Sequence, residues 1–254
     1  MSKSNRTQPP SARAIEGQPW NRYARERLLS RNYLVFYHHR LAFEQFISFF
    51  QRLSVTLRIV DVGCGDGFYL EQLRNLGFTS IEGVDPAPLF VAAAKKKGLR
   101  AAVGSVYDLA PAEAYDVALC MEVLEHLDDP ERALRSIRGV LVPDGILYLT
   151  VPIVNSLFHR WRRAWLHETR MDQLARIDET HRQVFTPTVL TALAVRCGFR
   201  VVSSWVGSNP VPGGELLAKV GLMGLAHWLQ RRTLGGTCGD RFIMVLKRRP
   251  GVNR

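Results

Sequence analysis

Two short segments of this 254-residue chain gather the residue types that enzymes use for ligand binding and proton transfer. The first, Asp61 to Gly67, places a carboxylate two residues before a cluster of glycines. The second segment ends in Glu122, Glu125 and His126, which share one face if they form a helical turn. Two carboxylates and an imidazole on one face can chelate a divalent metal or pass a proton. Spacing alone does not choose between these two roles.

The glycine segment follows an apolar run and precedes a helical pattern, which predicts a sharp turn at a helix N-terminus that suits a nucleotide-type ligand. A dinucleotide fingerprint needs glycine where Phe68 stands. Asp61 would repel a diphosphate but attract the ammonium of an amino-acid-like ligand. Asp85, at the end of the next predicted strand, can accept both hydroxyls of a ribose. These features disfavour a nicotinamide oxidoreductase.

The elements that must position these residues form an alternating series of strands and helices. The predicted strands are 57–62, 80–84, 100–103, 115–120, 146–151, 199–205 and 241–247. The predicted helices among them are 69–76, 89–97, 131–141 and 187–197. Such alternation is typical of an α/β fold with a mostly parallel sheet and helices on both faces.

The remaining stretches divide the chain further. We expect a disordered basic arm at 1–18, an N-terminal helical cap at 19–56, the main domain at 57–248 and a tail at 249–254. Within the main domain, 153–183 is interpreted as a lid inserted after the fifth strand, and 208–235 as an insertion with a hydrophobic helix at 215–229. The lid's cluster of arginine and tryptophan can hold a phosphate, stack on a ring or pack on the core. The hydrophobic helix is too short to span a bilayer and suits the core, a dimer face or a membrane interface.

Composition bounds the functional class. An apolar content of 46% can build the core of a soluble enzyme, and a net charge of +11 favours an anionic partner such as RNA, a phosphorylated substrate or an acidic membrane face. The four cysteines are far apart, and the sequence opens without a signal-peptide pattern. We therefore expect a cytoplasmic protein that can contact a membrane peripherally. The oligomeric state is not indicated.

Taken together, these segments resemble the class I S-adenosylmethionine-dependent methyltransferases from about Leu57 to Trp205. The matching segments, in order, are Asp61 to Gly67, Glu82 to Pro86, Gly104 to Val106, Tyr115 to His126 and Leu141 to Gly145. The resemblance implies a Rossmann-like fold with a seven-stranded, mostly parallel sheet, helices on both sides, an N-terminal helical region and a lid after strand 5. It also implies S-adenosylmethionine as the cofactor.

The resemblance assigns roles to single residues. It places Gly63 and Gly65 under the methionine part of the cofactor, Asp85 on the ribose, and Ser105 with Val106 at the adenine. The full expected cofactor site comprises Asp61, Gly63, Cys64, Gly65, Asp85, Pro86, Ser105, Val106 and Met121. Ser105 stands where many relatives have Asp, which weakens one adenine contact. Asp144 stands where many have Gly, which changes only a turn.

The pattern E-x-x-E-H is similar to that of ubiquinone-biosynthesis O-methyltransferases and of small-RNA 3′-end 2′-O-methyltransferases, where it binds a divalent cation. In the RNA enzymes a downstream histidine joins the site, and His181 is the candidate here. The resemblance thus implies a cation such as Mg²⁺ held by Glu122, Glu125, His126 and His181. It also implies Glu125, His126 and His181 as the catalytic residues. In many other relatives Glu125 and His126 occur without metal, and His126 then shapes the acceptor pocket.

We therefore expect an S-adenosylmethionine-dependent methyltransferase that acts on a small-molecule or lipid-linked acceptor, at oxygen. Methyl transfer from a sulfonium mainly needs alignment and exclusion of water, and a hydroxyl acceptor must also lose its proton. Two alternatives stay open on the sequence alone: an RNA methyltransferase, favoured by the basic charge, and a cofactor-binding scaffold without catalysis.

Overall fold

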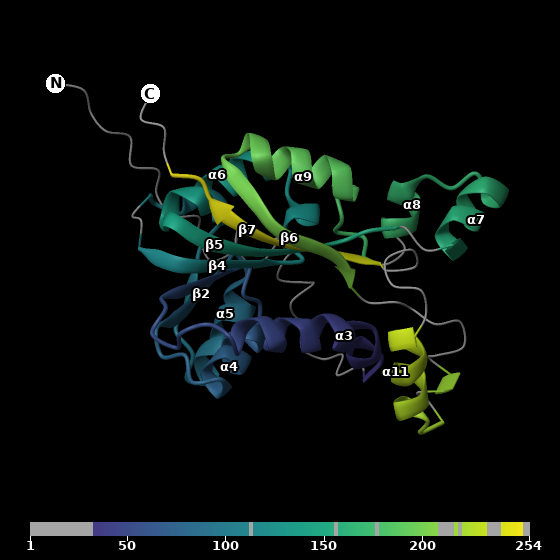
Figure 1. Ribbon diagram of the computed structural model, residues 1–254, viewed down its shortest axis with the longest axis horizontal. Coiled ribbons are helices and arrows are strands. Elements are labelled where there is room, and N and C mark those ends of the chain that lie inside the picture. The colour runs from purple at the N-terminus through teal and green to yellow at the C-terminus, as the bar shows by residue number, and fades with distance from the viewer. Residues whose placement is uncertain are drawn as a thin grey trace.

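The computed structural model describes residues 33–111, 114–154, 157–175, 178–207, 216–217, 220–232 and 240–250. The expected basic arm at 1–18 lies outside these residues, as do residues 19–32 of the expected N-terminal helical cap, parts of the insertion at 208–235 and the last four residues of the tail. The described part is built around one central sheet with helices on both faces (Figure 1).

Seven strands form the sheet. They are β1 (Ile59–Val62), β2 (Ile81–Asp85), β3 (Ala101–Val103), β4 (Tyr115–Met121), β5 (Leu141–Pro152), β6 (Phe199–Gly207) and β7 (Arg241–Arg248). Their order is β3-β2-β1-β4-β5-β7-β6, and β7 runs opposite to the other six strands. The predicted Rossmann-like α/β fold with a mostly parallel seven-stranded sheet is confirmed.

The strand order reverses between β1 and β4, which lie side by side. Val62 at the end of β1 pairs with Cys120 near the end of β4. In open α/β sheets, ligands bind at the carboxyl ends of the strands at this switch point. Each of the two chemically rich segments begins at one of these two strand ends, so the fold brings them together.

Helices α6 (Pro130–Val140) and α9 (Pro187–Arg196) cover one face of the sheet (Figure 1). Each begins after a polar residue followed by proline, and the Asp129 carboxylate accepts a hydrogen bond from the backbone N–H of Arg132 at 2.9 Å. Buried apolar side chains fill this face, among them Leu134, Ile137, Leu147, Leu149, Leu190, Ala194, Met244 and Leu246.

Helices α3 (Tyr33–Phe50), α4 (Phe68–Asn75) and α5 (Pro88–Lys96) cover the other face (Figure 1). Phe46 and Phe50 of α3 are fully buried, and their rings lie 5.8 and 5.7 Å from the ring of Tyr148 in β5. The Trp205 indole N–H donates to the Gln45 side chain at 2.8 Å and ties α3 to β6. The second half of α3 is therefore part of the core.

Two short 3-10 helices lie between the strands, and β5 begins earlier than the sequence predicts. Helix η1 (Val106–Asp108) follows β3, and η2 (Leu124–His126) follows β4. Strand β5 begins at Leu141, where a predicted helix was expected to end, because Leu141 already pairs with Tyr115 of β4. Asp144, within β5, has a φ of 59°, a left-handed conformation that aspartate adopts more readily than most residues. This explains how it stands where relatives have glycine.

Three further helices lie at the end of the sheet toward which β6 points (Figure 1). Helices α7 (Leu157–Leu166) and α8 (Arg170–Ala175) occupy the segment interpreted as a lid, and α11 (Met223–Arg232) lies in the predicted hydrophobic insertion. Among the described residues, no helix is both long and apolar enough to cross a membrane.

Replacing Phe46 tests whether α3 belongs to the core. We expect Phe46→Ala to lower the free energy of unfolding by about 3–5 kcal/mol, because a fully buried aromatic ring leaves a cavity. Val55→Ala, at a position that is 44% exposed, should change it by less than about 0.5 kcal/mol. Urea denaturation measures both. A loss for Phe46→Ala as small as that of the control would show that α3 is only loosely attached.

Candidate active site

The turn from β1 into α4 is built from glycines in the left-handed region. Gly63, Gly65 and Gly67 have φ values of 76°, 55° and 80°, which side chains rarely allow. The backbone N–H of Gly63 donates to the carbonyl of Val84 at 2.7 Å and fixes the turn against β2. A Cβ on Gly63 would lie 2.3 Å from Val123, whereas a Cβ on Gly65 would meet no atom within 4 Å. The turn therefore has open space beside Gly65.

Asp61 is a buried carboxylate in β1, with 1% of its surface exposed. Neither carboxylate oxygen has a hydrogen-bond partner in the described part of the chain. Burial, and then the nearby Asp85, raise the pKa of Asp61 to about 7. A buried acceptor without a donor is costly, so this carboxylate suits a cationic ligand group.

Asp85 is the second buried carboxylate at the switch point, and its oxygens are oriented by the backbone. Oδ2 accepts from the N–H of Gly65 at 2.9 Å, and Oδ1 accepts from the N–H of Ala87 at 2.8 Å. Burial raises the pKa of Asp85, and these two hydrogen bonds oppose that rise. Each carboxylate oxygen can accept a second hydrogen bond, so Asp85 can still bind hydroxyl groups.

Glu122 does not share a helical face with Glu125 and His126, and this expectation was wrong. Its φ is 56°, and η2 begins only at Leu124. Its Oε1 accepts from the Thr150 hydroxyl at 2.8 Å, and its Oε2 accepts from the Arg241 guanidinium at 3.0 Å. Both oxygens are thus bound by side chains of β5 and β7, which draw Glu122 out of the helical turn.

Glu125, His126 and His181 do come together. One ligand atom from each lies within 4.8 Å of the others, and all three side chains are at least 90% buried. The His126 Nε2 is 3.8 Å from the Glu125 Oε1, and the two imidazole centroids are 4.9 Å apart. The backbone N–H groups of Arg182 and Gln183 donate to the Glu125 carbonyl at 2.7 and 3.0 Å, which docks the His181 segment on η2.

Glu125 resembles Asp61 electrostatically. Its two carboxylate oxygens have no hydrogen-bond partner in the part of the chain that the structure describes. Burial, and then the charge of Glu122, raise the pKa of Glu125 well above its ordinary value. The switch point therefore holds two buried carboxylates, one on each side, that can bind a cationic group or carry a proton.

The orientation of His126 follows from a chain of hydrogen bonds. The Thr180 hydroxyl donates to Oδ1 of Asp178 at 2.5 Å, and its oxygen lies 2.9 Å from Nδ1 of His126. Because the hydroxyl proton points to Asp178, the Thr180 oxygen must accept from Nδ1–H. The lone pair of a neutral His126 is then on Nε2, facing Glu125. Burial, and then His181, lower the pKa of His126.

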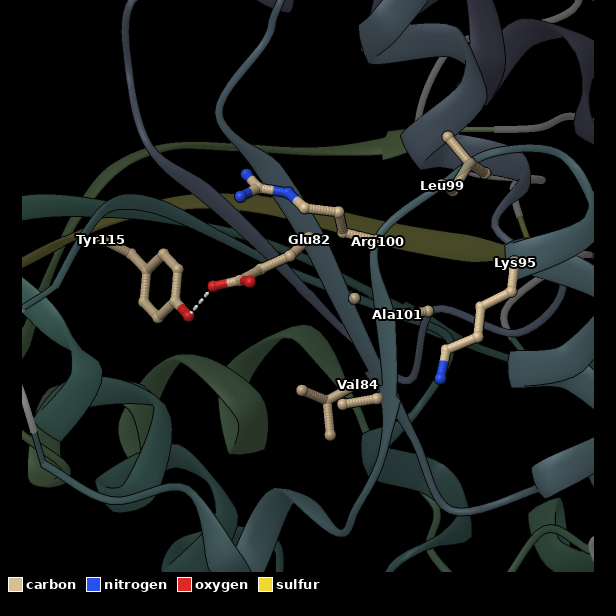
Figure 2. A pocket seen from close by; sticks show the side chains of 9 residues that line it. Glu82, Val84, Lys95, Leu99, Arg100, Ala101 and Tyr115 are labelled. Carbon is tan, nitrogen blue, oxygen red and sulfur yellow. Dashed lines mark hydrogen bonds between the residues drawn. The ribbon is translucent and has the colours of Figure 1, made fainter.

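A hollow of about 430 Å³ lies apart from these groups, against β2, β3 and the start of β4. It is lined by Glu82, Gly83, Val84, Lys95, Leu99, Arg100, Ala101, Ala102 and Tyr115. Figure 2 shows the Tyr115 hydroxyl directed at Glu82, to which it donates a hydrogen bond. Burial, and then this bond, raise the pKa of Tyr115 to about 12. The lining includes none of the expected site residues, so we do not place the chemistry here.

The comparisons with known proteins identify the family of the chain. A family model described as a methyltransferase domain matches residues 33–204. The chain belongs to this methyltransferase domain family. A ubiquinone biosynthesis O-methyltransferase of Xanthomonas oryzae pv. oryzae is 38% identical over 101 residues, which are 37% of this chain and 42% of that protein. One of Bradyrhizobium diazoefficiens is 33% identical over 112 residues, 42% of each chain. The match thus spans less than half the length of these relatives.

Solved structures share the fold. A SAM-dependent methyltransferase of Thermotoga maritima, described as a possible histamine N-methyltransferase, superposes with a TM-score of 0.60 at 20% identity. The superposition covers 93% of this chain and 99% of that one. This likeness shows the methyltransferase fold.

In this methyltransferase domain the other expected cofactor residues lie in different environments. Cys64 packs inward, since a Cβ on Gly83 would lie 2.5 Å from its sulfur, and burial raises the pKa of Cys64. The Ser105 hydroxyl accepts from the backbone N–H of Tyr107 at 3.2 Å and caps η1. Val106 and Met121 are buried, and Pro86 is exposed. Gly83 escaped the sequence reasoning, although a glycine inside a predicted strand signals a close contact.

Thr180 and Arg241 were also missed by sequence reasoning. Arg241 is buried; burial lowers its pKa, but the carboxylate of Glu122 and other groups raise it by more, and Arg241 pairs with the half-buried Glu122. Thr180 stands beside the expected His181, but only the fold brings its hydroxyl to His126. Sequence reasoning misses both contacts, because Arg241 and Glu122, and likewise Thr180 and His126, lie far apart in the chain.

The hydrogen-bond chain to His126 can be tested without any reaction. We expect Thr180→Val to lower the population of the Nδ1–H tautomer of His126, because the hydroxyl that accepts from Nδ1–H is lost and only the backbone of residue 180 remains as a partner. Nitrogen-15 NMR of histidine side chains measures this, with the His126 signal assigned from a His126→Gln variant. Thr169→Val is the matched control, since the Thr169 hydroxyl also donates to an aspartate, Asp172, at 2.7 Å. An unchanged tautomer in Thr180→Val would contradict the assignment.

Proposed function

We propose that this chain transfers the methyl group of S-adenosylmethionine to an oxygen atom of a small-molecule or lipid-linked acceptor. The observation that carries the proposal is the pairing of two sites on adjacent strands. The glycine turn with Asp61 and Asp85 lies at the end of β1 and β2, and the cluster that contains Glu125 and His126 follows β4. A donor bound at the first site would present its methyl group toward the second.

The first site fits the donor group by group. The unpartnered oxygens of Asp61 suit an ammonium group, directly or through water. The remaining lone pairs of Asp85 suit ribose hydroxyls, and the open space beside Gly65 leaves room for the ligand chain. When bound, S-adenosylmethionine supplies a methyl group on a positively charged sulfur.

The second site fits an acceptor that must lose a proton. As the acceptor oxygen forms its bond to the methyl carbon, the carbon–sulfur bond breaks and its electron pair stays on the sulfur. The hydroxyl proton passes to Nε2 of His126, which holds the lone pair. Because burial lowers the pKa of His126, this imidazole is neutral near pH 7 and ready to accept. The burial of all three side chains excludes competing water.

The same three side chains fit a divalent cation. The unpartnered oxygens of Glu125 and the close approach of His126 and His181 meet the demands of a ligand set. Two imidazoles and one carboxylate suit a transition-metal dication better than Mg²⁺, which prefers oxygen ligands. A bound cation would lower the pKa of the acceptor hydroxyl. Glu122 lies outside this set, because Thr150 and Arg241 engage its oxygens.

The acceptor class rests on two supports. Relatives at 33–38% identity are named ubiquinone biosynthesis O-methyltransferases, which favours transfer to oxygen. Exposed apolar side chains of α7 and α11 at the active end of the sheet suit an apolar acceptor (Figure 1). The basic charge also favours RNA as an acceptor, and extraction of the labelled product into organic solvent distinguishes RNA from an apolar acceptor.

The pH dependence of donor-product binding tests Asp61. An ammonium group binds the ionised carboxylate, and the pKa of Asp61 is raised to about 7. The affinity for S-adenosylhomocysteine should therefore rise about tenfold between about pH 6 and pH 8, as Asp61 loses its proton. Isothermal calorimetry measures this. Asp61→Asn should bind more weakly and without this pH dependence.

Asp116→Asn is the matched control, because Asp116 lies at the opposite end of β4 and pairs with Arg58. It should keep both the affinity and its pH dependence. The role of Asp61 would be refuted by a flat pH profile in the unaltered protein.

Replacement of His126 tests the acceptor site. We expect His126→Gln to reduce kcat about 10²–10⁴-fold with unchanged affinity for S-adenosylhomocysteine, because only proton removal is lost. Transfer of labelled methyl to a prenylated hydroxybenzene, extracted into organic solvent, measures turnover. His167→Gln, at an exposed position, is the control.

Two further readings of this assay discriminate the alternatives. Labelled methyl that is found in added RNA and stays in the aqueous phase would contradict the proposal of a lipid-linked acceptor. Loss of turnover after chelation, restored by Mn²⁺, would assign His126 to a cation rather than to the proton. No labelled product from any acceptor, with intact donor-product binding, would favour a scaffold.

A further inference from the structure

Helix α7 exposes large apolar side chains to solvent. Trp161 and Trp165 are 51% and 71% exposed, and their rings stack with centroids 5.7 Å apart. Arg163 points inward instead, where it donates to the carbonyl of Val154 at 3.0 Å and to the Gln173 side chain at 3.3 Å. A helix that packs on a soluble protein ordinarily shows the reverse arrangement. Exposed apolar side chains gathered in this way mark an interaction surface.

Helix α11 and the residue before it show the same feature. Leu222, Leu225 and Trp228 recur every three residues and are 49%, 45% and 49% exposed, whereas Ala226 is fully buried. The alternative that this helix packs its large apolar residues in the core is therefore wrong for these three side chains. We call the exposed residues of α7 and α11 the apolar end surface: Trp161, Trp165, Leu166, Leu222, Leu225 and Trp228.

The segments that carry the apolar end surface are net basic, since residues 157–175 contain four arginines and two acidic residues, Glu168 and Asp172. Helix α7 contains three arginines and α11 contains two, and neither helix contains an acidic residue. Burial, and then the nearby Arg170 and Arg160, lower the pKa of Arg163, so these guanidinium groups lie close enough to repel one another. A partner that covers this surface must therefore bring negative charge as well as apolar contact.

We propose that the apolar end surface docks on the surface of an anionic lipid bilayer. Tryptophan prefers the boundary between acyl chains and headgroups, leucine enters the apolar layer, and arginine binds lipid phosphates. Both helices lie at the end of the sheet that carries the active site (Figure 1). Docking goes beyond the proposed transfer, because it requires no turnover.

Two other occupants suit the surface less well. A second copy of the chain, joined about a two-fold axis, would bring the arginines of α7 against those of its partner without an acidic residue in either helix. RNA would pair with the arginines but would leave the leucines of α11 without an apolar partner. A bilayer satisfies the aromatic, aliphatic and cationic side chains together.

Vesicle binding by the 254-residue chain tests the proposal. We expect binding to vesicles of phosphatidylglycerol mixed with phosphatidylcholine and little binding to pure phosphatidylcholine. Lipids brominated in the acyl chain should quench the tryptophan fluorescence. Trp161→Ser with Trp165→Ser, and separately Leu225→Ser with Trp228→Ser, should each weaken binding about tenfold or more.

Val189→Ser with Val195→Ser is the control, because these α9 residues are also exposed, at 54% and 38%, but lie on another face. It should bind vesicles as the unaltered chain does. Equal binding to both kinds of vesicle, unchanged binding by both tryptophan variants, or no vesicle binding would each overturn the proposal. Affinity for S-adenosylhomocysteine is measured on the same samples, so failure of the cofactor site remains distinguishable from failure of docking.

Discussion

The burial of carboxylates at the switch point of the sheet is the constraint on which the rest of the structure depends. Asp61 lies inside β1, paired with strands on both sides, and Glu125 lies on η2 beyond the adjacent strand. Desolvation raises the pKa of Asp61 and of Glu125, so each lowers the stability of the folded chain when it is ionised. The sheet fixes the backbone of Asp61, and the N–H groups of Arg182 and Gln183 hold that of Glu125, although neither carboxylate gains hydrogen bonds from the described residues.

The antiparallel strand β7 gives the carboxylate of Glu122 a partner that the carboxylates of Asp61 and Glu125 lack among the described residues. Because β7 lies between β5 and β6, Arg241 at its start pairs with the end of β5 and reaches Glu122. Thr150 of β5 supplies the second contact to the same carboxylate. Glu122 is thereby paired within the protein, whereas the carboxylate oxygens of Glu125 have no hydrogen-bond partner in the described part of the chain. The different environments of Glu122 and Glu125 follow from the topology, since a parallel β7 would place Arg241 at the opposite end of the strands.

Sequence predicts this fold well because its signals are local. Alternating apolar periods give the strands and helices, and the positions of Asp61 and Asp85 follow from where two strands end. The site is less predictable where a role depends on a distant partner. Glu122 leaves the expected helical face because of Arg241, 119 residues away, and the tautomer of His126 is set by Thr180, 54 residues away. Periodicity carries no information on such contacts.

The exposed apolar side chains of α7 and α11 lie at the end of the sheet that carries the buried carboxylates (Figure 1). An outward-facing pair of tryptophans and an inward-facing Arg163 reverse the usual amphipathic order, which a stable helix tolerates only if another surface compensates the exposed area. Since α7 and α11 lie at the same end of the sheet as the buried carboxylates, that surface would also be the source of the acceptor (Figure 1). A lipid-linked hydroxyl could then reach His126 without leaving the bilayer completely. The proposed docking would thus join basic charge, exposed tryptophan and buried acid in one route from the membrane to the methyl donor.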